Sequence, residues 1–204
     1  MINPSEALER LRKGNARFVA NELSRSVSKL ERARLASGQN PFAVILGCSD
    51  SRVPIEIVFD QGLGDLFVIR VAGNIVAPSQ IGSVEFAAQK FATRLVVVLG
   101  HTQCGAVEAT IDELQRPAEK QSRNIAAIVS RIRPSVMDLL ECGEVMDREE
   151  LIRQAVRENV RYSSNALRHG SDIIEDLISK EEFLIVGAEY SLDTGVVEFF
   201  DGAP

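Results

Sequence analysis

The chain has 204 residues and a formal net charge of −6 at pH 7. This length fits one domain with a full hydrophobic core. The acidic balance, without a basic stripe that carries aromatic side chains, argues against a nucleic-acid partner. No apolar run approaches the roughly 20 residues of a membrane-spanning helix, and the start lacks the pattern of a signal peptide. We therefore expect a cytoplasmic protein with neither a nucleic-acid nor a membrane partner.

The N-terminal region predicts two helices. The first begins at Asn3 and carries Leu8 and Leu11 on one face. The second begins at Ser28, in a segment that fits a capping box, and ends at Gly38. Both helices carry little apolar area, so we expect them to need another surface, and a partner subunit is one candidate.

The remainder alternates between apolar runs and helical patterns. Helices are predicted over 79–91, from Gly105 onward and over 121–180, the last with a break at Pro134. Strands are predicted over 43–47, 66–70, 95–100, 183–187 and 195–200. The alternation predicts an α/β fold with a mostly parallel central sheet, of about four parallel strands plus an antiparallel edge strand, flanked by helices. We expect a single domain over 1–204, with a helical arm at 1–38 and an α/β core at 39–204.

Three cysteines are too few for a disulfide framework and suit thiols that bind metal or act in catalysis. We interpret Cys142 as a packing residue, because a free cysteine behaves as a small hydrophobe. Cys48 follows the first predicted strand, whereas His101 and Cys104 follow the third. Ligands gather at the carboxyl ends of strands in such sheets. If the two strands are neighbours, these residues form the Cys₂His set of a zinc site with one open position.

Asp50 is an ambiguous fourth member, because it can coordinate zinc itself or hold a zinc-bound water. Arg52 bears on that choice, since a guanidinium takes a carboxylate in a bidentate pair and draws it off the metal. Zinc then lowers the pKa of water at the open position toward about 7. The sequence thus predicts a hydroxide nucleophile at neutral pH.

Two other interpretations of these motifs remain open from the residues alone. Zinc is purely structural if Asp50 closes the tetrahedron. Alternatively, Cys48 is the nucleophile of a cysteine-phosphatase loop in which Arg52 binds phosphate, although this leaves His101 and Cys104 without a role.

Four segments together resemble a β-class carbonic anhydrase, and the similarity runs from the first helix to the turn at 190–195. The segments are Cys48–Pro54, Phe59–Arg70, Gly73-Asn74 and Gly100–Val107. The resemblance implies Zn²⁺ on Cys48, His101 and Cys104, with Asp50 and Arg52 as a catalytic dyad. It also implies an open state, in which the dyad is paired, and a closed state, in which Asp50 becomes the fourth zinc ligand.

The resemblance further implies a substrate pocket and an oligomer. Gln39 matches a glutamine that reaches across a dimer to bind bicarbonate, and Phe67 matches an aromatic wall of the same pocket. Phe86 stands where many members have tyrosine, which makes the pocket more apolar. Family enzymes are homodimers, often paired into tetramers, whose first helices pack on the partner.

Some family members have a second, inhibitory bicarbonate site that needs a tryptophan. Ile45 stands at that position and the chain has no Trp, so we do not expect this site here. Arg70 and Tyr190 match its other parts, and we interpret them as packing and hydrogen-bonding residues.

The expected function is zinc-dependent, reversible hydration of carbon dioxide to bicarbonate and a proton by a zinc-bound hydroxide, gated by Asp50 and Arg52. A related zinc hydrolase that acts on carbonyl sulfide or carbon disulfide would share every ligand. A non-catalytic, zinc-held dimer module or bicarbonate sensor is an alternative from another class.

Overall fold

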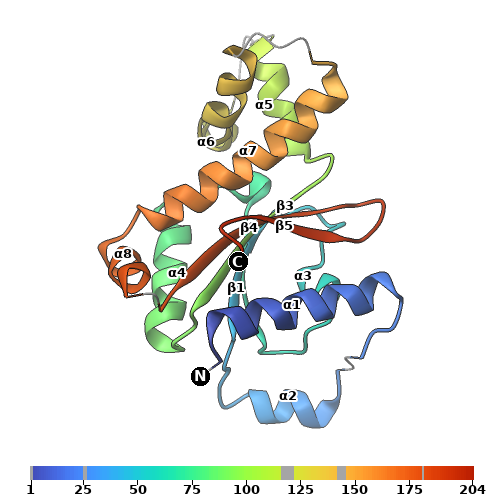
Figure 1. Ribbon diagram of the computed structural model, residues 1–204, viewed down its shortest axis with the longest axis vertical. Coiled ribbons are helices and arrows are strands. Elements are labelled where there is room, and N and C mark those ends of the chain that lie inside the picture. The colour runs from blue at the N-terminus through green and yellow to red at the C-terminus, as the bar shows by residue number, and fades with distance from the viewer. Residues whose placement is uncertain (1, 25–26, 116–121, 142–145, 181) are drawn as a thin grey trace.

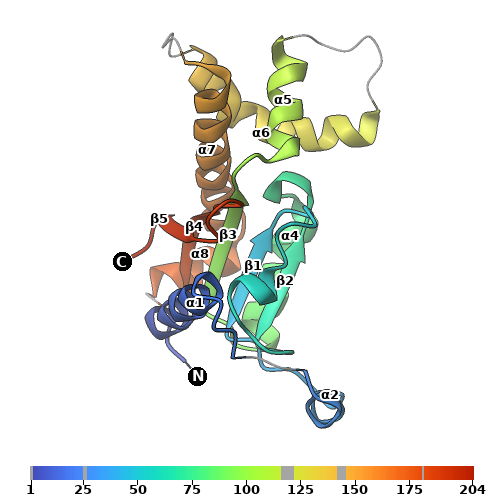
Figure 2. The ribbon, with the colours of Figure 1, turned by 90° about the vertical axis from the view of Figure 1, so that its right-hand side faces the viewer.

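The computed structural model describes residues 2–24, 27–115, 122–141, 146–180 and 182–204. A five-stranded sheet with helices on both faces forms its centre (Figures 1 and 2). The strands lie in the order β2-β1-β3-β4-β5; the first four are parallel and β5 is antiparallel to β4, which confirms the predicted sheet. Their bounds are β1 Ala43–Gly47, β2 Leu66–Arg70, β3 Leu95–His101, β4 Leu184–Tyr190 and β5 Val197–Asp201.

All the α-helices except α2 form three groups around the sheet. The α-helices are α1 Pro4–Val19, α2 Lys29–Leu35, α3 Ile55–Val58, α4 Pro78–Lys90, α5 Gly105–Gln115, α6 Arg123–Glu141, α7 Arg148–Arg168 and α8 Asp172–Ser179, and a short 3₁₀ helix, η1, spans Ala72–Asn74. Helices α1 and α3 pack on one face, whereas α4, α8 and part of α7 pack on the other. The third group, α5, α6 and the rest of α7, forms a core beyond the carboxyl ends of the strands.

Strands β1 and β3 are buried along their whole length, because helices cover both faces of the sheet. This explains their continuous apolar sequence, which is typical of central parallel strands. Gly47 pairs with Leu99 in the parallel register. Both strands therefore end at the same edge of the sheet, beneath α5.

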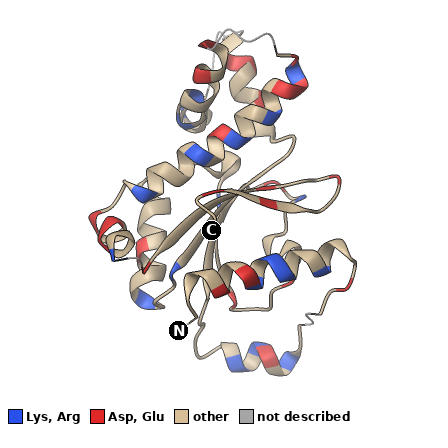
Figure 3. Cartoon of the chain, viewed as in Figure 1, with Lys and Arg blue, Asp and Glu red and all other residues tan. Residues whose placement is uncertain are grey.

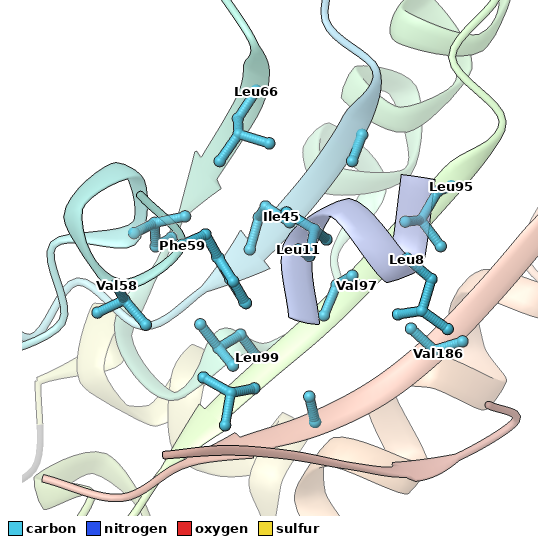
Figure 4. Close-up of a cluster of buried hydrophobic side chains, with 14 of the residues drawn as sticks. Leu8, Leu11, Ile45, Val58, Phe59, Leu66, Leu95, Val97, Leu99 and Val186 are labelled. Atoms are coloured by element: carbon cyan, nitrogen blue, oxygen red, sulfur yellow. The ribbon is translucent and has the colours of Figure 1, made fainter. Parts of the chain in front are cut away.

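Helix α1 packs on the sheet of its own chain. Asn3 and Glu6 form a complete capping box at its start. Leu8 and Leu11 are wholly buried and lie in one cluster with Ile45 and Val97 (Figure 4). The other surface that this helix was expected to need is therefore, for its apolar face, the sheet of its own chain.

Helix α2 differs, because none of its residues is buried. It begins after Ser28 as predicted, but it ends at Leu35 rather than Gly38. Charges of both signs alternate along α2 and along the outer face of α1 (Figure 3). Leu30 of α2 is 82% exposed, the highest exposure among the large apolar side chains of the described residues.

The predicted break at Pro134 is wrong, because α6 continues through this residue from Arg123 to Glu141. Proline removes one backbone donor, but buried Ile132 and Val136 lie on either side of it and pack into the same core. This packing outweighs the lost hydrogen bond.

Cys142 lies outside the described residues. No described helix is long and apolar enough to span a bilayer.

Asn15 joins α1 to two distant segments. Its side chain is buried, and Nδ2 donates to the carbonyl oxygens of Val58 (3.2 Å) and Gly195 (2.9 Å). Its Oδ1 accepts from the backbone N–H of Val197 at 2.8 Å. One side chain thereby satisfies three backbone groups that meet where α1, α3 and β5 converge.

We predict that Asn15→Ala lowers the free energy of unfolding by about 2–3 kcal/mol, because it leaves buried backbone groups without partners. Urea unfolding at a fixed protein concentration measures this change. Asn124→Ala, at an exposed position of α6, is the control and should change stability by less than about 0.5 kcal/mol. Equal stability of the two variants would contradict the prediction.

Candidate metal centre

Three elements place the candidate ligands at one edge of the sheet. Cys48 directly follows β1, His101 is the last residue of β3, and Cys104 directly precedes α5. One ligand atom from each of these residues lies within 4.8 Å of the others, and all three side chains are buried. The prediction that the two motifs meet is therefore confirmed.

The His101 ring is oriented for a metal. Its Nδ1 donates to the carbonyl oxygen of Thr102 at 2.9 Å, which leaves the lone pair on Nε2. The ring is wholly buried, and Nε2 has no hydrogen-bond partner among the described residues. A backbone carbonyl that fixes one ring nitrogen is typical of metal-ligating histidines, whose second nitrogen binds the ion.

The two thiols compete for one negative charge. Hydrogen bonding from Cys104 lowers the pKa of the Cys48 thiol to about 4 despite burial, with help from His101 and the Gly73 N–H. The pKa of Cys104 is raised, because this thiol is paired with Cys48 and is itself deeply buried. A divalent cation would offset the repulsion and allow both to ionise. Two thiolates and an imidazole fit zinc.

Asp50 and Arg52 form a bidentate pair beside this cluster. Arg52 donates from Nε to Oδ1 at 3.0 Å and from Nη2 to Oδ2 at 2.7 Å. This guanidinium holds the pKa of the Asp50 carboxyl well below its usual range. Oδ2 of Asp50 lies 3.8 Å from Nε2 of His101. The carboxylate is thus ionised, held by Arg52 and adjacent to the candidate ligands.

Arg70 fixes the loop that carries these residues. From the end of β2 it donates to the carbonyl oxygen of Cys48 at 3.1 Å and to that of Asp50 at 2.6 Å. The interpretation of Arg70 as a hydrogen-bonding residue agrees with these contacts.

Tyr190, which was interpreted together with Arg70, is buried. Its ring packs near that of Phe18, at 6.4 Å between centroids.

Sequence reasoning missed a second support. The backbone N–H of Gly73 donates to Sγ of Cys48 at 3.3 Å, and Nδ2 of Asn159 donates to the Gly73 carbonyl oxygen at 2.8 Å. In the sequence, Gly73-Asn74 stood out only as part of the family resemblance. Nothing in the sequence points to Asn159, which is 86 positions from Gly73 and lies in a helix of otherwise ordinary pattern.

Phe67, one of the predicted pocket residues, lies away from the cluster of its own chain. Phe67 lies opposite Val44 in the sheet, and Val44 precedes Cys48 by four residues, a separation of about 13 Å along a strand. Its ring packs against those of Phe86 and Phe91, at 6.2 and 6.0 Å between centroids. Phe86 is 51% exposed, and Gln39 is exposed after the end of α2.

The fold resembles that of β-carbonic anhydrases of known structure. The enzyme CafA of Aspergillus fumigatus has a TM-score of 0.76 at 24% identity over 97% of this chain and 90% of that one. A tetrameric β-carbonic anhydrase of Sordaria macrospora has a TM-score of 0.74 at 22% identity over 83% of this chain and 85% of that one. At these identities the likeness establishes the fold alone.

Sequence comparison establishes the family. A carbonic anhydrase family model matches residues 43–197. A carbonic anhydrase of Mycolicibacterium smegmatis is 41% identical over 96% of this chain and 93% of its own length. Carbonic anhydrase 2 of Mycobacterium tuberculosis is 40% identical over 95% of this chain and 91% of its own. The chain therefore belongs to the carbonic anhydrase family of enzymes, which confirms the predicted resemblance.

We predict that the chain binds one equivalent of Co²⁺ with a sulfur-to-cobalt charge-transfer absorption, because both thiolates lie within reach of one ion. Titration followed by absorption spectroscopy measures this. Cys104→Ala should weaken binding by at least about a hundredfold, more than the loss of a supporting residue costs. Cys142→Ser is the matched control and should leave the spectrum unchanged. Full absorption in Cys104→Ala would refute the assigned cluster.

Proposed function

We propose that this chain catalyses the reversible hydration of carbon dioxide to bicarbonate and a proton, with Zn²⁺ held by Cys48, His101 and Cys104. When bound, zinc supplies Lewis-acid activation of water at neutral pH. The family assignment and the buried Cys-His-Cys cluster support this proposal.

The observation that carries the mechanism is the Asp50–Arg52 pair next to the cluster. An ionised carboxylate only accepts hydrogen bonds. Asp50 would therefore accept a hydrogen bond from the attacking oxygen and turn the lone pair of that oxygen toward the carbon of the substrate. Arg52 keeps Asp50 charged and aimed, and the Gln103 carbonyl oxygen, 3.2 Å from Nη2, holds the guanidinium in place.

The pairing of Asp50 with Arg52 is one of two arrangements that we propose. In the other, Asp50 leaves Arg52 and becomes a fourth ligand of the metal, which blocks the open position. The distance of 3.8 Å between Oδ2 and Nε2 of His101 supports this exchange, because the carboxylate already borders the ligand set. The dyad would then gate the enzyme.

Stopped-flow measurement of carbon dioxide hydration, together with metal analysis, tests the proposed function. We expect turnover that requires zinc and is lost in His101→Ala. Carbonyl sulfide and carbon disulfide should be assayed on the same preparation. Faster turnover of either compound than of carbon dioxide would assign the chain to the related hydrolases instead.

We predict that Arg52→Ala retains zinc but loses turnover by about a hundredfold or more, because Asp50 is no longer held as an oriented acceptor. Metal analysis and stopped-flow kinetics on the same sample measure both quantities. Arg161→Ala, which removes an exposed arginine paired with Glu158 on α7, is the control and should retain full activity. A fully active Arg52→Ala enzyme would exclude the proposed role.

We further propose that the working form is a homodimer in which each subunit completes the pocket of the other. Phe67 lies away from the cluster of its own chain with Phe86 packed against its ring, Gln39 is exposed, and α2 buries no residue. Leu30, Ile57 and Phe86 are 82%, 51% and 51% exposed. A partner subunit would cover these apolar side chains and bring the pocket residues to the second cluster.

Mixed dimers test this arrangement. Gln39→Ala and Asp50→Asn should each lower activity when present in both subunits. Co-refolding the two variants should restore activity to about a quarter of that of the unaltered enzyme, because half of the dimers are mixed and each mixed dimer holds one intact site. Activity no higher than the average of the two parents would show that Gln39 serves its own subunit.

A further inference from the structure

We infer that Asn159 is a positioning residue for the metal ligand Cys48, acting through the backbone of Gly73. This inference rests on the proposed zinc site. Asn159 lies on α7, on the far side of Gly73 from the sulfur, and its side chain is 99% covered, since only 1% of the residue is exposed. Among the described residues, its side chain makes one hydrogen bond, which goes to Gly73.

Two consecutive hydrogen bonds connect the amide to the sulfur. Nδ2 of Asn159 donates to the Gly73 carbonyl oxygen at 2.8 Å. The N–H of the same glycine donates to Sγ of Cys48 at 3.3 Å, which is within the range of a hydrogen bond to sulfur. Both bonds are buried, so neither competes with water, and each is stronger for that reason.

Gly73 needs such support because its own backbone does not hold it. Its φ is +67°, a left-handed conformation that glycine adopts freely and leaves freely. A Cβ at this position would lie 2.6 Å from Cδ1 of Ile132 and 3.1 Å from Cβ of Ala106, so a stiffer residue does not fit. Gly73 has no side chain that could restrain its backbone. The hydrogen bond from Asn159 provides this restraint instead.

The direction of the Gly73 N–H matters for the sulfur that receives it. A hydrogen bond to a thiolate withdraws electron density and fixes the direction of its remaining lone pairs. Supporting residues of this kind orient metal ligands, and their loss typically lowers metal affinity by about 10- to 100-fold. Asn159 thus places one ligand of the site under the control of α7, a helix that contributes no ligand itself.

Asn15 provides a matched comparison. It is also a buried asparagine that hydrogen-bonds to backbone groups of other elements. Its hydrogen bonds go to Val58, Gly195 and Val197, none of which belongs to the cluster or to η1. A purely structural role of Asn159 would therefore give Asn159→Ala and Asn15→Ala the same consequences for metal binding.

The experiment measures zinc affinity by competition with a chromophoric chelator for the unaltered chain, Asn159→Ala, Asn159→Leu and Asn15→Ala. We expect about tenfold weaker binding in both Asn159 variants and unchanged binding in Asn15→Ala. Asn159→Leu keeps a similar side-chain size but has no donor, so it separates the hydrogen bond from packing. Thermal unfolding with and without zinc provides a second measure, because weaker binding reduces the zinc-induced rise in Tm.

The cobalt spectrum gives a readout that a loss of stability alone would not move. When the Gly73 N–H is no longer held toward Cys48, the sulfur lone pair rises in energy, so the charge-transfer band should shift to longer wavelength in the Asn159 variants only. Folded Asn159 variants with zinc affinity within about twofold of the unaltered chain and an unshifted band would overturn the inference while leaving the zinc site intact. Absence of zinc and cobalt binding by the unaltered chain would overturn the inference and the proposed function together.

Discussion

The in-register pairing of β1 with β3 is the constraint on which the site depends. Because Gly47 lies opposite Leu99, the residues that follow both strands emerge at one edge of the sheet. Cys48 and His101 then meet without any long loop, and the start of α5 brings Cys104 to the same point. A shift of one residue in this register would turn every strand side chain to the opposite face and separate the ligands.

Around this edge, the chain surrounds a small polar cluster with rigid support. Arg70 holds two carbonyl oxygens of the loop after β1, Thr102 fixes the imidazole, and Gly73 directs its N–H at Cys48. These contacts come from β2, from the residue after β3 and from η1, which all belong to the packed core of the chain. The arrangement of the ligands is therefore prepared by the fold, and less of the binding free energy is spent on ordering them.

Much of this could be predicted from the sequence, because the strongest signals are local. Runs that are apolar on both faces identify central strands, and the residues that follow them identify the site. Prediction failed where packing between distant segments decides the outcome. The core around Ile132 and Val136 carries α6 past Pro134, and Asn159 reaches Gly73 across 86 positions. The pocket residues were recognisable only through the family, and their separation from the cluster required coordinates.

The hydrogen bonds from Arg70 to the loop after β1 restrict how the Asp50 carboxylate could change partners. With the carbonyl oxygens of Cys48 and Asp50 both bound by one guanidinium, the backbone on either side of Ser49 is pinned. A carboxylate that changes partners on such a loop moves by rotation about its own side-chain bonds. Rotamer exchange of this kind takes picoseconds to nanoseconds at exposed positions, whereas loop opening takes up to microseconds. The proposed gating by Asp50 would then need no loop opening and would leave no trace in backbone hydrogen exchange.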